Sequence, residues 1–341
     1  MGPTGRALKR ATILLAVGGV LARAVGILLH LVHRRRADVA PVWLPEHVTP
    51  SPQGDGLFIA VNTESGSDGP PTEDLRRLLP EATIEEVDVV EGSELERCLE
   101  RAATSATVIG VCGGDGSINT AAKIAIENSK PLVVIPGGTF NHLGHSLGLT
   151  SVEDAVEAVR EGHAVCMDVG SIDGYVFVNT ASFGSYVQLV DARKKLESKI
   201  GKWAAILVAL VRVLRTGQPL DIEIDGNRCR VWMAFIGNCR YDPSGFAPTR
   251  RTRLDDGLLD FRYVDGSHPW ARARLIAAIL TGWLGRSRVY REATPTEIRV
   301  RSLEGPMRLA RDGETFEASD DVEVKKLPRS LVVYASPAVS S

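Results

Sequence analysis

Apolar runs of strand length alternate with segments of helical spacing through the first half of the folded chain. Residues 57–61 form a continuous apolar run, and further strands are expected at 82–90, which contains β-branched residues, at 107–112 and at 132–135. Runs of this length are typical of strands buried on both faces of a parallel sheet. Segments with helical spacing separate them, over 72–79, 94–103 and 118–127. This alternation predicts an α/β domain with a doubly wound, mostly parallel sheet over residues 57–165.

The pattern changes after about residue 166, where short strands of alternating polarity follow one another. They are expected at 169–172, 175–179, 220–225, 228–236, 259–264 and 297–301. Turn dipeptides such as Asp225-Gly226 and Asp256-Gly257 join them, which favours antiparallel pairing. Two helical stretches, 200–215 and 270–281, interrupt the strands. We therefore predict an antiparallel, all-β sandwich domain over residues 166–309.

The amino-terminal segment differs from the rest of the chain. Residues 11–32 are mostly apolar and are followed by three arginines, and about 20 apolar residues span a bilayer. Arg23 lies in the middle of this segment, where a charge is costly. We expect residues 1–36 to form a helix that spans or lies on the cytoplasmic face of a membrane, with a terminal helix packed on the domain as the alternative. Residues 37–56, rich in proline and charge, are predicted to be a linker.

The amino-acid composition excludes fewer functions than the pattern of apolar residues and motifs does. The 341 residues are 44% hydrophobic and 24% charged, with a formal net charge of −2. This length suits about two domains of ~100–200 residues each. A balanced charge argues against nucleic acid as a partner, because that needs a concentrated basic surface. The five cysteines form no C-x-x-C pair, which indicates reduced, buried thiols.

A glycine-rich loop follows the strand predicted at 107–112. Residues 113–119 read GGDGSIN and lead directly into a helix. Glycines here leave backbone amides open to phosphate oxygens, and the helix amino terminus favours an anion. Asp115 is placed to meet a Mg²⁺ ion carried by such phosphates. The spacing fits neither the dinucleotide fingerprint nor the P-loop, and a purely structural tight turn is the competing interpretation.

A second glycine loop follows the strand predicted at 132–135. Residues 136–142 read PGGTFNH and offer glycine amides, the Thr139 hydroxyl and the Asn141 carboxamide. Both loops come at the carboxyl ends of parallel strands, the edge at which ligands bind in this architecture. Together they predict a nucleotide-phosphate site.

The pair GGDGS-x-N and P-x-GT-x-N resembles the signature of the diacylglycerol kinase catalytic-domain family, shared with sphingosine and ceramide kinases and, more distantly, NAD kinases. The resemblance covers residues 57–336 and is strongest to the kinase half of phosphatase-linked diacylglycerol kinase proteins. Further segments occur in the family's order, namely DVG at 168–170, FVNTASFG at 177–184, RLDDGLLD at 253–260 and DGE at 312–314.

The resemblance implies a NAD-kinase/diacylglycerol-kinase-like two-domain fold, with residues 310–336 returning to an active site between the domains. It implies an ATP- and Mg²⁺-dependent kinase that phosphorylates the hydroxyl group of a lipid. The default lipid substrate of the family is diacylglycerol. The implied partners are a membrane lipid substrate, the membrane surface and, because the family often pairs through its β-rich domain, a second copy of the chain.

The resemblance also implies residue roles. Asp312 would be the general base, and Glu314 would support it or the metal. The residues implied in ATP binding are Asn62, Gly113, Gly114, Asp115, Gly116, Ser117, Ile118, Asn119, Gly138, Thr139 and Asn141. Besides Asp115, a second and structural Mg²⁺ site would be formed by the Asp256 side chain with the carbonyls of Arg253 and Leu258.

Other functions stay open at this point. A kinase of a soluble acceptor, as in the NAD kinases, uses the same motifs, and a non-catalytic lipid- or nucleotide-binding regulatory protein can share the scaffold. Three residues depart from the family's pattern. Thr63 stands where the family usually has Pro, His142 stands where many members have Asp, and Ser117 stands where the family usually has Thr. The arginines at 250, 251 and 253 are expected either to meet phosphate or anionic headgroups or to form a solvated loop.

Overall fold

The computed structural model describes residues 45–64, 69–88, 93–137, 141–188, 217–242, 250–251, 253–268, 270–281 and 287–337. The predicted anchor at 1–36, the predicted helix at 200–215, and Gly138 and Thr139 lie outside these residues. Within the described ranges, no helix is long and apolar enough to cross a membrane.

The first domain is built on a parallel sheet in the order β5-β4-β2-β3. Its strands are β2 (Leu57–Asn62), β3 (Thr83–Val87), β4 (Val108–Gly113) and β5 (Leu132–Pro136). The side chains of Ile59, Val111 and Val134 are fully buried, because helices cover both faces of the sheet. The predicted doubly wound α/β domain is confirmed.

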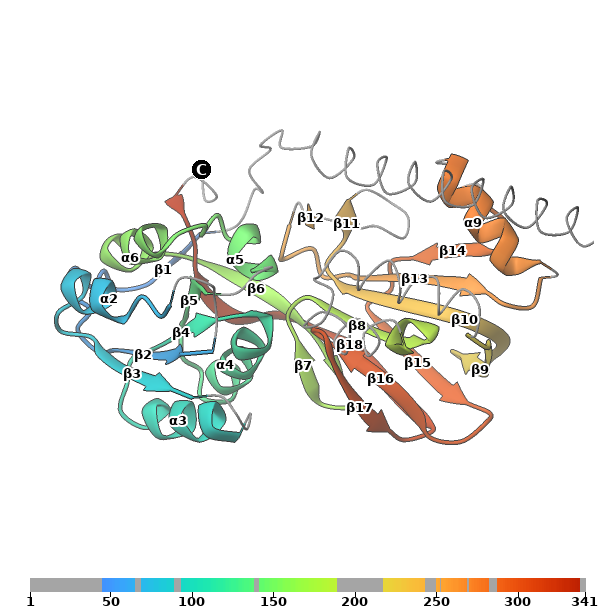
Figure 1. The fold of residues 1–341 in the computed structure, drawn as a ribbon, viewed down its shortest axis with the longest axis horizontal. Helices are drawn as coiled ribbons and strands as arrows, with labels where there is room; N and C mark the ends of the chain where they lie inside the picture. Colours follow the sequence, from blue (N-terminus) through green and yellow to red (C-terminus); the bar gives the residue numbers. More distant parts are fainter. Residues whose placement is uncertain are drawn as a thin grey trace, which may run out of the picture.

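Two pairs of helices enclose this sheet (Figure 1). The helices α3 (Ser93–Ala103) and α4 (Asp115–Glu127) pack together on one face, and α2 (Thr72–Leu78) and α6 (Val152–Glu161) lie on the other. A short helix, α5 (His142–Ser146), follows the second glycine loop. α4 begins three residues earlier than the sequence pattern predicts, so residues 115–117 form its first turn.

The second domain is antiparallel and rich in strands, as predicted. The path through its sheet runs β17-β16-β8-β10-β9-β15-β18, and off this path β13 pairs with β10 and β14 pairs with β13. The strands are β8 (Thr180–Gly184), β9 (Leu220–Ile224), β10 (Asn227–Asn238), β13 (Leu259–Asp265), β14 (Tyr290–Ala293), β15 (Glu297–Ser302), β16 (Met307–Arg311) and β17 (Glu314–Ala318). Alternating residues of these strands, such as Phe183, Ile236 and Leu309, form a core separate from that of the first domain. The helix α9 (Ala271–Thr281) and the small pair β11 (Tyr241–Asp242) and β12 (Arg250–Arg251) complete the domain.

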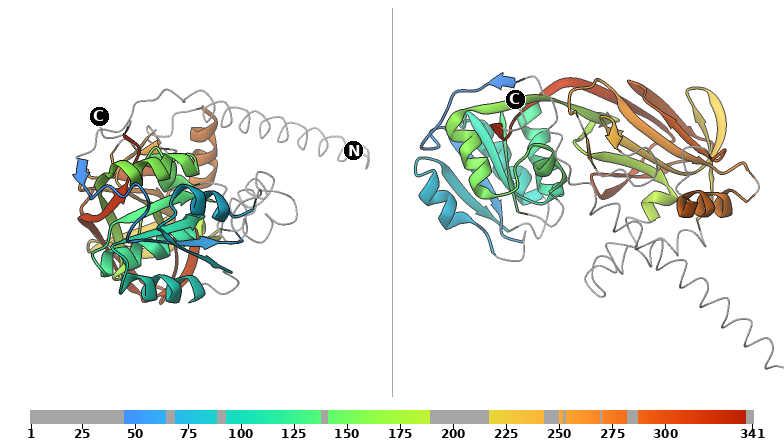
Figure 2. Two further views of the ribbon diagram at one scale, coloured as in Figure 1. Left: turned by 90° about the vertical axis from the view of Figure 1, so that its left-hand side faces the viewer. Right: turned by 90° about the horizontal axis from the view of Figure 1, so that it is seen from above.

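Two long antiparallel strands join the domains (Figures 1 and 2). They are β6 (His163–Ile172) and β18 (Asp321–Tyr334). β18 pairs with β15 in the second domain and, after an irregularity between Leu327 and Leu331, with β5 in the first. The predicted boundary at residues 165 and 166 therefore falls inside β6. The segment 310–336 supplies a strand to both domains as well as a turn near the glycine loop.

The linker prediction is wrong over part of its length. Pro45–His47 form strand β1, which pairs antiparallel with β6. The sequence PEH has neither apolar alternation nor a β-branched residue, so its strand character comes from the edge that β6 offers.

Candidate active site at the junction of the domains

The first glycine loop is the amino terminus of α4. Gly114 is the N-cap residue, and among the described residues no side chain caps this helix. The first backbone bond of the helix runs from the N–H of Ile118 to the carbonyl of Gly114, at 3.0 Å. The amides of Asp115, Gly116 and Ser117 consequently have no acceptor within the helix, and the helix dipole adds a favourable field for an anion. This is the geometry of a phosphate-binding helix terminus.

The glycines of the two loops allow the carboxyl ends of three strands to come together. A Cβ on Gly137 would lie 3.0 Å from the Gly113 nitrogen, and one on Gly113 would lie 2.7 Å from the Ser117 Cβ. At the end of β2, the Asn62 amide donates to the Ser117 hydroxyl at 3.0 Å. Asn62, Gly113 and Ser117 are therefore brought together, as the sequence predicts.

Ile118 does not fit its predicted role in nucleotide binding. Its side chain is fully buried in the core of the first domain, and its N–H is bonded within the helix. Its apolar side chain at the start of a helix of small and apolar residues was the available signal for a place in the core.

Asp115 links the first loop to the rest of the junction. Its Oδ1 accepts hydrogen bonds from the His142 backbone N–H at 3.1 Å and from the Asn179 amide at 3.5 Å. Glu314, from the DGE motif, lies opposite, with Oε1 3.3 Å from the place where Gly116 would carry a Cβ. Asp115 is partly exposed and Glu314 is exposed, so both carboxylates can reach a ligand. Four segments far apart in the chain meet at this point.

The third acidic residue, Asp312, is buried between the domains. It follows β16 in a left-handed conformation (φ 43°), which aspartate tolerates better than most residues. Its Oδ1 accepts from the backbone N–H groups of Asn179 at 2.9 Å and Thr180 at 2.8 Å, and its Oδ2 accepts from that of Val178 at 2.8 Å. Burial and, to a smaller extent, the charge of Asp115 raise the pKa of Asp312 to about 6, against the opposing effect of the three amides.

Asn119 supplies a fourth donor to the same carboxylate. In the orientation that satisfies both neighbouring acceptors, its amide nitrogen lies 2.9 Å from Asp312 Oδ2 and 3.2 Å from the Val176 carbonyl. An ionised carboxylate has about four acceptor positions, so those of Asp312 are all used. Of its donors, Asn119 alone is a side chain. In this conformation the Asp312 carboxylate binds the backbone of the 178–180 segment. Asp312 can accept a proton from a substrate only if the Asn119 side chain turns away and leaves Oδ2 accessible.

The 178–180 segment is itself held by side chains that the sequence interpretation assigned no role. Arg251 donates to the Val178 carbonyl at 2.6 Å and to Asn179 Oδ1 at 2.9 Å, and Asn238 donates to the Val178 carbonyl at 3.0 Å. Arg251 is buried, so the expectation that it meets phosphate or lies in a solvated loop is wrong. A polar residue inside an apolar run, as Asn179 in FVNTASF and Asn238 at the end of β10, was the available signal.

The predicted structural Mg²⁺ site does not fit a metal ion. Both oxygens of Asp256 accept backbone N–H groups, from Leu258 and from Arg240, each at 2.9 Å. The Leu258 carbonyl accepts the Cys239 N–H at 3.1 Å. The Arg253 guanidinium pairs with Asp255 at 2.9 and 3.0 Å.

A side-chain ammonium lies beside the Asp256 carboxylate, the side chain that was expected to hold the cation. The buried Lys326 Nζ is 3.9 Å from Asp256 Oδ1 and 3.6 Å from Asp168 Oδ2. A divalent ion at this position would face a positive charge at contact distance, which the local low dielectric makes costly. We therefore assign no metal to this loop.

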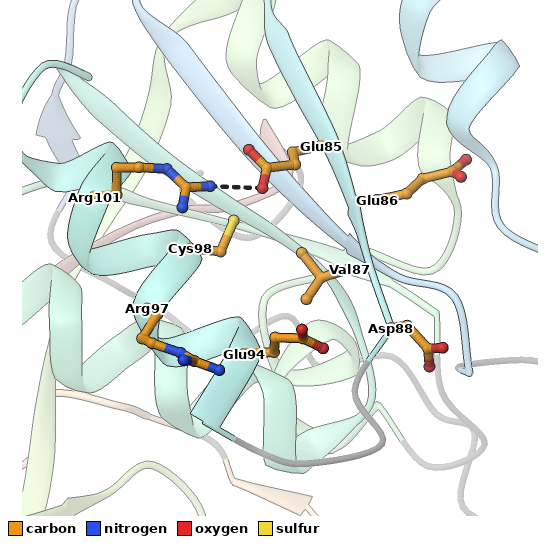
Figure 3. A pocket seen from close by; sticks show the side chains of 8 residues that line it. All are labelled: Glu85, Glu86, Val87, Asp88, Glu94, Arg97, Cys98 and Arg101. Atoms are coloured by element: carbon orange, nitrogen blue, oxygen red, sulfur yellow. Dashed lines mark hydrogen bonds and ion pairs between the residues drawn. The ribbon is translucent and has the colours of Figure 1, made fainter.

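A separate hollow of about 440 Å³ lies at the outer edge of the first domain, between β3 and α3 (Figure 3). Its lining is mainly charged: Glu85, Glu86, Val87, Asp88, Glu94, Arg97, Cys98 and Arg101. Arg101 points to Glu85 and pairs with it at 2.6 Å. The excess of carboxylates does not complement a polyphosphate, and none of the junction residues lines the hollow.

Comparison with known proteins identifies the first domain. Residues 56–172 match the family model described as the diacylglycerol kinase catalytic domain. These residues belong to the diacylglycerol kinase catalytic-domain family. The match includes Asn62 and the first glycine loop and ends with β6, whereas Asp312, Glu314 and Lys326 lie beyond it.

Curated proteins and solved structures agree with this family. The chain is 31% identical over 154 residues to a diacylglycerol kinase of Staphylococcus carnosus, covering 43% of this chain and 50% of the relative. It is 30% identical over 180 residues to a diacylglycerol kinase of Bacillus subtilis, and the alignment covers 50% of this chain and 58% of that relative. The chain thus spans about half the length of the curated relatives it matches. A crystal structure of a Bacillus anthracis diacylglycerol kinase superposes with a TM-score of 0.59 at 19% sequence identity, and the superposition covers 83% of this chain and 97% of that one. A second structure from the same organism superposes with a TM-score of 0.65 at 21% sequence identity. At this identity the structures establish the shared two-domain fold alone.

Proposed function

We propose that this protein is an ATP-dependent kinase that transfers the γ-phosphate to the hydroxyl of a lipid, with diacylglycerol as the first candidate. The observation that carries the proposal is the convergence at one junction of the open amides of α4 and three carboxylates, Asp115, Asp312 and Glu314. Phosphoryl transfer depends on positioning and charge neutralisation, and an anion site beside carboxylates supplies both. The names of the relatives favour diacylglycerol as the acceptor.

In this proposal the phosphates of ATP bind the backbone amides of residues 115–117. Asp115 would hold the Mg²⁺ ion that accompanies ATP, since one of its oxygens already serves His142 and Asn179 and the other is available. Glu314 faces the same space from the second domain. The ion would neutralise charge on the phosphate oxygens.

Asp312 is the proposed base. It takes the proton of the lipid hydroxyl while that oxygen bonds to the γ-phosphorus and the bond to the bridging oxygen breaks, which releases ADP. A pKa of about 6 suits a base that works near neutral pH. Asn119 must first turn from Oδ2, because the other donors are backbone amides fixed by the 178–180 segment.

We also propose that the protein works at the cytoplasmic face of a membrane, to which residues 1–36 attach it. A lipid acceptor resides there, and the apolar segment 11–32 with its basic flanks suits a bilayer surface.

The test is transfer of label from γ-labelled ATP with Mg²⁺ to lipids in detergent micelles, with NAD as the soluble control. Labelled phosphatidic acid from diacylglycerol, absent with Asp312→Asn, would support both the reaction and the acceptor. Label on NAD alone would assign a soluble acceptor. Binding of ATP without transfer to any acceptor would favour a regulatory protein on the same scaffold.

A further inference from the structure

Lys326 is a buried lysine in the strand that joins the two domains. Val322 and Val324 precede it at alternate positions of β18 and are buried, so strand alternation directs Lys326 inward as well. It lies just before the irregularity in β18 that begins after Leu327, where the strand passes from the second domain to the first (Figure 1). A lysine at such a position is stable only if its ammonium is paired.

The surroundings of the ammonium are oxygen and sulfur atoms from three elements. Nζ lies 2.6 Å from Asn238 Oδ1 and 2.9 Å from Cys239 Sγ, at the end of β10. The carboxylates of Asp168, in β6, and Asp256 lie at 3.6 and 3.9 Å. Without Lys326, Asp168, Cys239 and Asp256 would present ligand atoms within 4.8 Å of one another, a separation suited to one cation.

We infer that the Lys326 ammonium is the built-in cation of the cluster formed by Asp168, Cys239 and Asp256. It takes the place of a metal ion, so this loop folds without one. This inference does not rest on the proposed kinase activity, since it concerns the charge balance of the cluster alone.

The ammonium also positions part of the candidate active site. Asn238 Oδ1 accepts a hydrogen bond from Lys326, which fixes the orientation of the Asn238 amide. The amide nitrogen then donates to the carbonyls of Asp168 at 2.9 Å and Val178 at 3.0 Å. Val178 begins the 178–180 segment, whose N–H groups bind the Asp312 carboxylate. Lys326 is therefore connected to the Asp312 carboxylate through Asn238 and the 178–180 segment.

Removal of the ammonium leaves the buried carboxylate of Asp168 and the partly buried carboxylate of Asp256 without their nearest counter-charge. Each oxygen of Asp168 and Asp256 accepts one backbone N–H and keeps a second lone pair. Hard divalent cations such as Mg²⁺ and Mn²⁺ bind carboxylate oxygens, so a variant without the Lys326 ammonium should acquire an affinity for metal that the wild-type protein lacks at this cluster. Gain of a property is a stricter test than loss, because a general weakening of the fold does not produce it.

The experiment measures thermal unfolding of the full chain without nucleotide, in EDTA and in millimolar MgCl₂ or MnCl₂. The variants are Lys326→Met and Lys326→Gln, each alone and combined with Asp256→Asn. Lys325→Met is the matched control, because Lys325 is the adjacent residue, is exposed and pairs with Glu323. We expect no metal-dependent change at the cluster in the wild type or the control. We expect a lower Tm for both Lys326 variants in EDTA and recovery of about 5 °C or more at a hundredfold metal excess over Kd. Asp256→Asn should abolish the recovery.

Two outcomes would overturn the inference. One is a metal-dependent rise in the wild-type Tm that Asp256→Asn removes, since the cluster would then hold a metal beside Lys326. The other is folded Lys326 variants that gain no response to metal. If neither Lys326 variant folds, the wild-type titration with its Asp256→Asn partner decides the question by itself.

Discussion

The hydrogen bond from Asn119 to Asp312 gives a direct test of the proposed base. Asn119→Ala removes the one side-chain donor to the Asp312 carboxylate and leaves the three backbone donors in place. A donor to a carboxylate stabilises its charged form, so its loss raises the pKa. The proposed base would then need a higher pH to be ionised.

The size of the shift follows from the energy of one hydrogen bond to a charged group. Such a bond contributes about 1.5–3 kcal/mol, and one pKa unit corresponds to about 1.4 kcal/mol. Asn119 is partly exposed, so water replaces part of the lost bond and the low end applies. We expect the pKa of Asp312 to be about one unit higher in Asn119→Ala than in the wild type.

The assay is the pH dependence of kcat/KM for lipid phosphorylation between about pH 5 and pH 9, whose acidic limb reports the base of the free enzyme. The limb should move up by about one pH unit in Asn119→Ala, with activity retained at pH 8. Asn128→Ala is the matched control, because Asn128 ends the same helix and its amide donates to the Ile124 carbonyl, away from Asp312. An acidic limb that stays at the wild-type pH in a folded Asn119→Ala enzyme would show that Asp312 is not the base.

Four further predictions follow from the same geometry. Asp312→Asn should abolish transfer in the micelle assay while retaining ATP binding, and turnover near that of the wild type would place the base elsewhere. The Asp312 pKa is about 6 when folded and lower when unfolded, so its contribution to stability is complete below about pH 4 and is lost as the pH rises through 6. The stability difference between wild type and Asp312→Asn, from urea unfolding, should therefore change by about 3 kcal/mol between pH 4 and pH 7, and a pH-independent difference would contradict the raised pKa. Gly137→Ala places a Cβ 3.0 Å from the Gly113 nitrogen and should separate the two loops, raising the KM for ATP about tenfold or more, whereas an unchanged KM would show that the loops do not bind nucleotide together. Removal of residues 1–36 should move the protein from the membrane fraction to the soluble fraction with activity in micelles retained, and a truncated protein that still sediments with membranes would refute the anchor.

The parts of the fold that could be predicted are those fixed by local pattern. β2, β4 and β5 are buried on both faces, so their apolar runs show in the sequence. The glycine loops follow these strands, and their position at one sheet edge comes from the parallel topology. β1 could not be predicted in this way, because Pro45–His47 form a strand only through pairing with β6.

The roles at the junction could not be read from local pattern, because they depend on contacts between distant residues. The carboxylate of Asp312 binds amides 132 to 134 positions away, and Lys326 contacts residues 87 and 88 positions away. Family resemblance led to Asp312 and to the Asp256 loop alike, yet it gave no sign that the second would be filled by an ammonium.

The Lys326 case shows which sequence signal could have found it. In the segment VEVKKL, Lys326 shares its face of the strand with Val322 and Val324, so strand alternation alone points a lysine into the core. A buried charge requires an opposite one nearby, and the chain offers aspartates in the DVG and DDG segments. Those aspartates, Asp168 and Asp256, are the ones that the ammonium meets. The same carboxylates therefore support two different predictions, a metal site or a lysine partner, and only the inward position of Lys326 separates them.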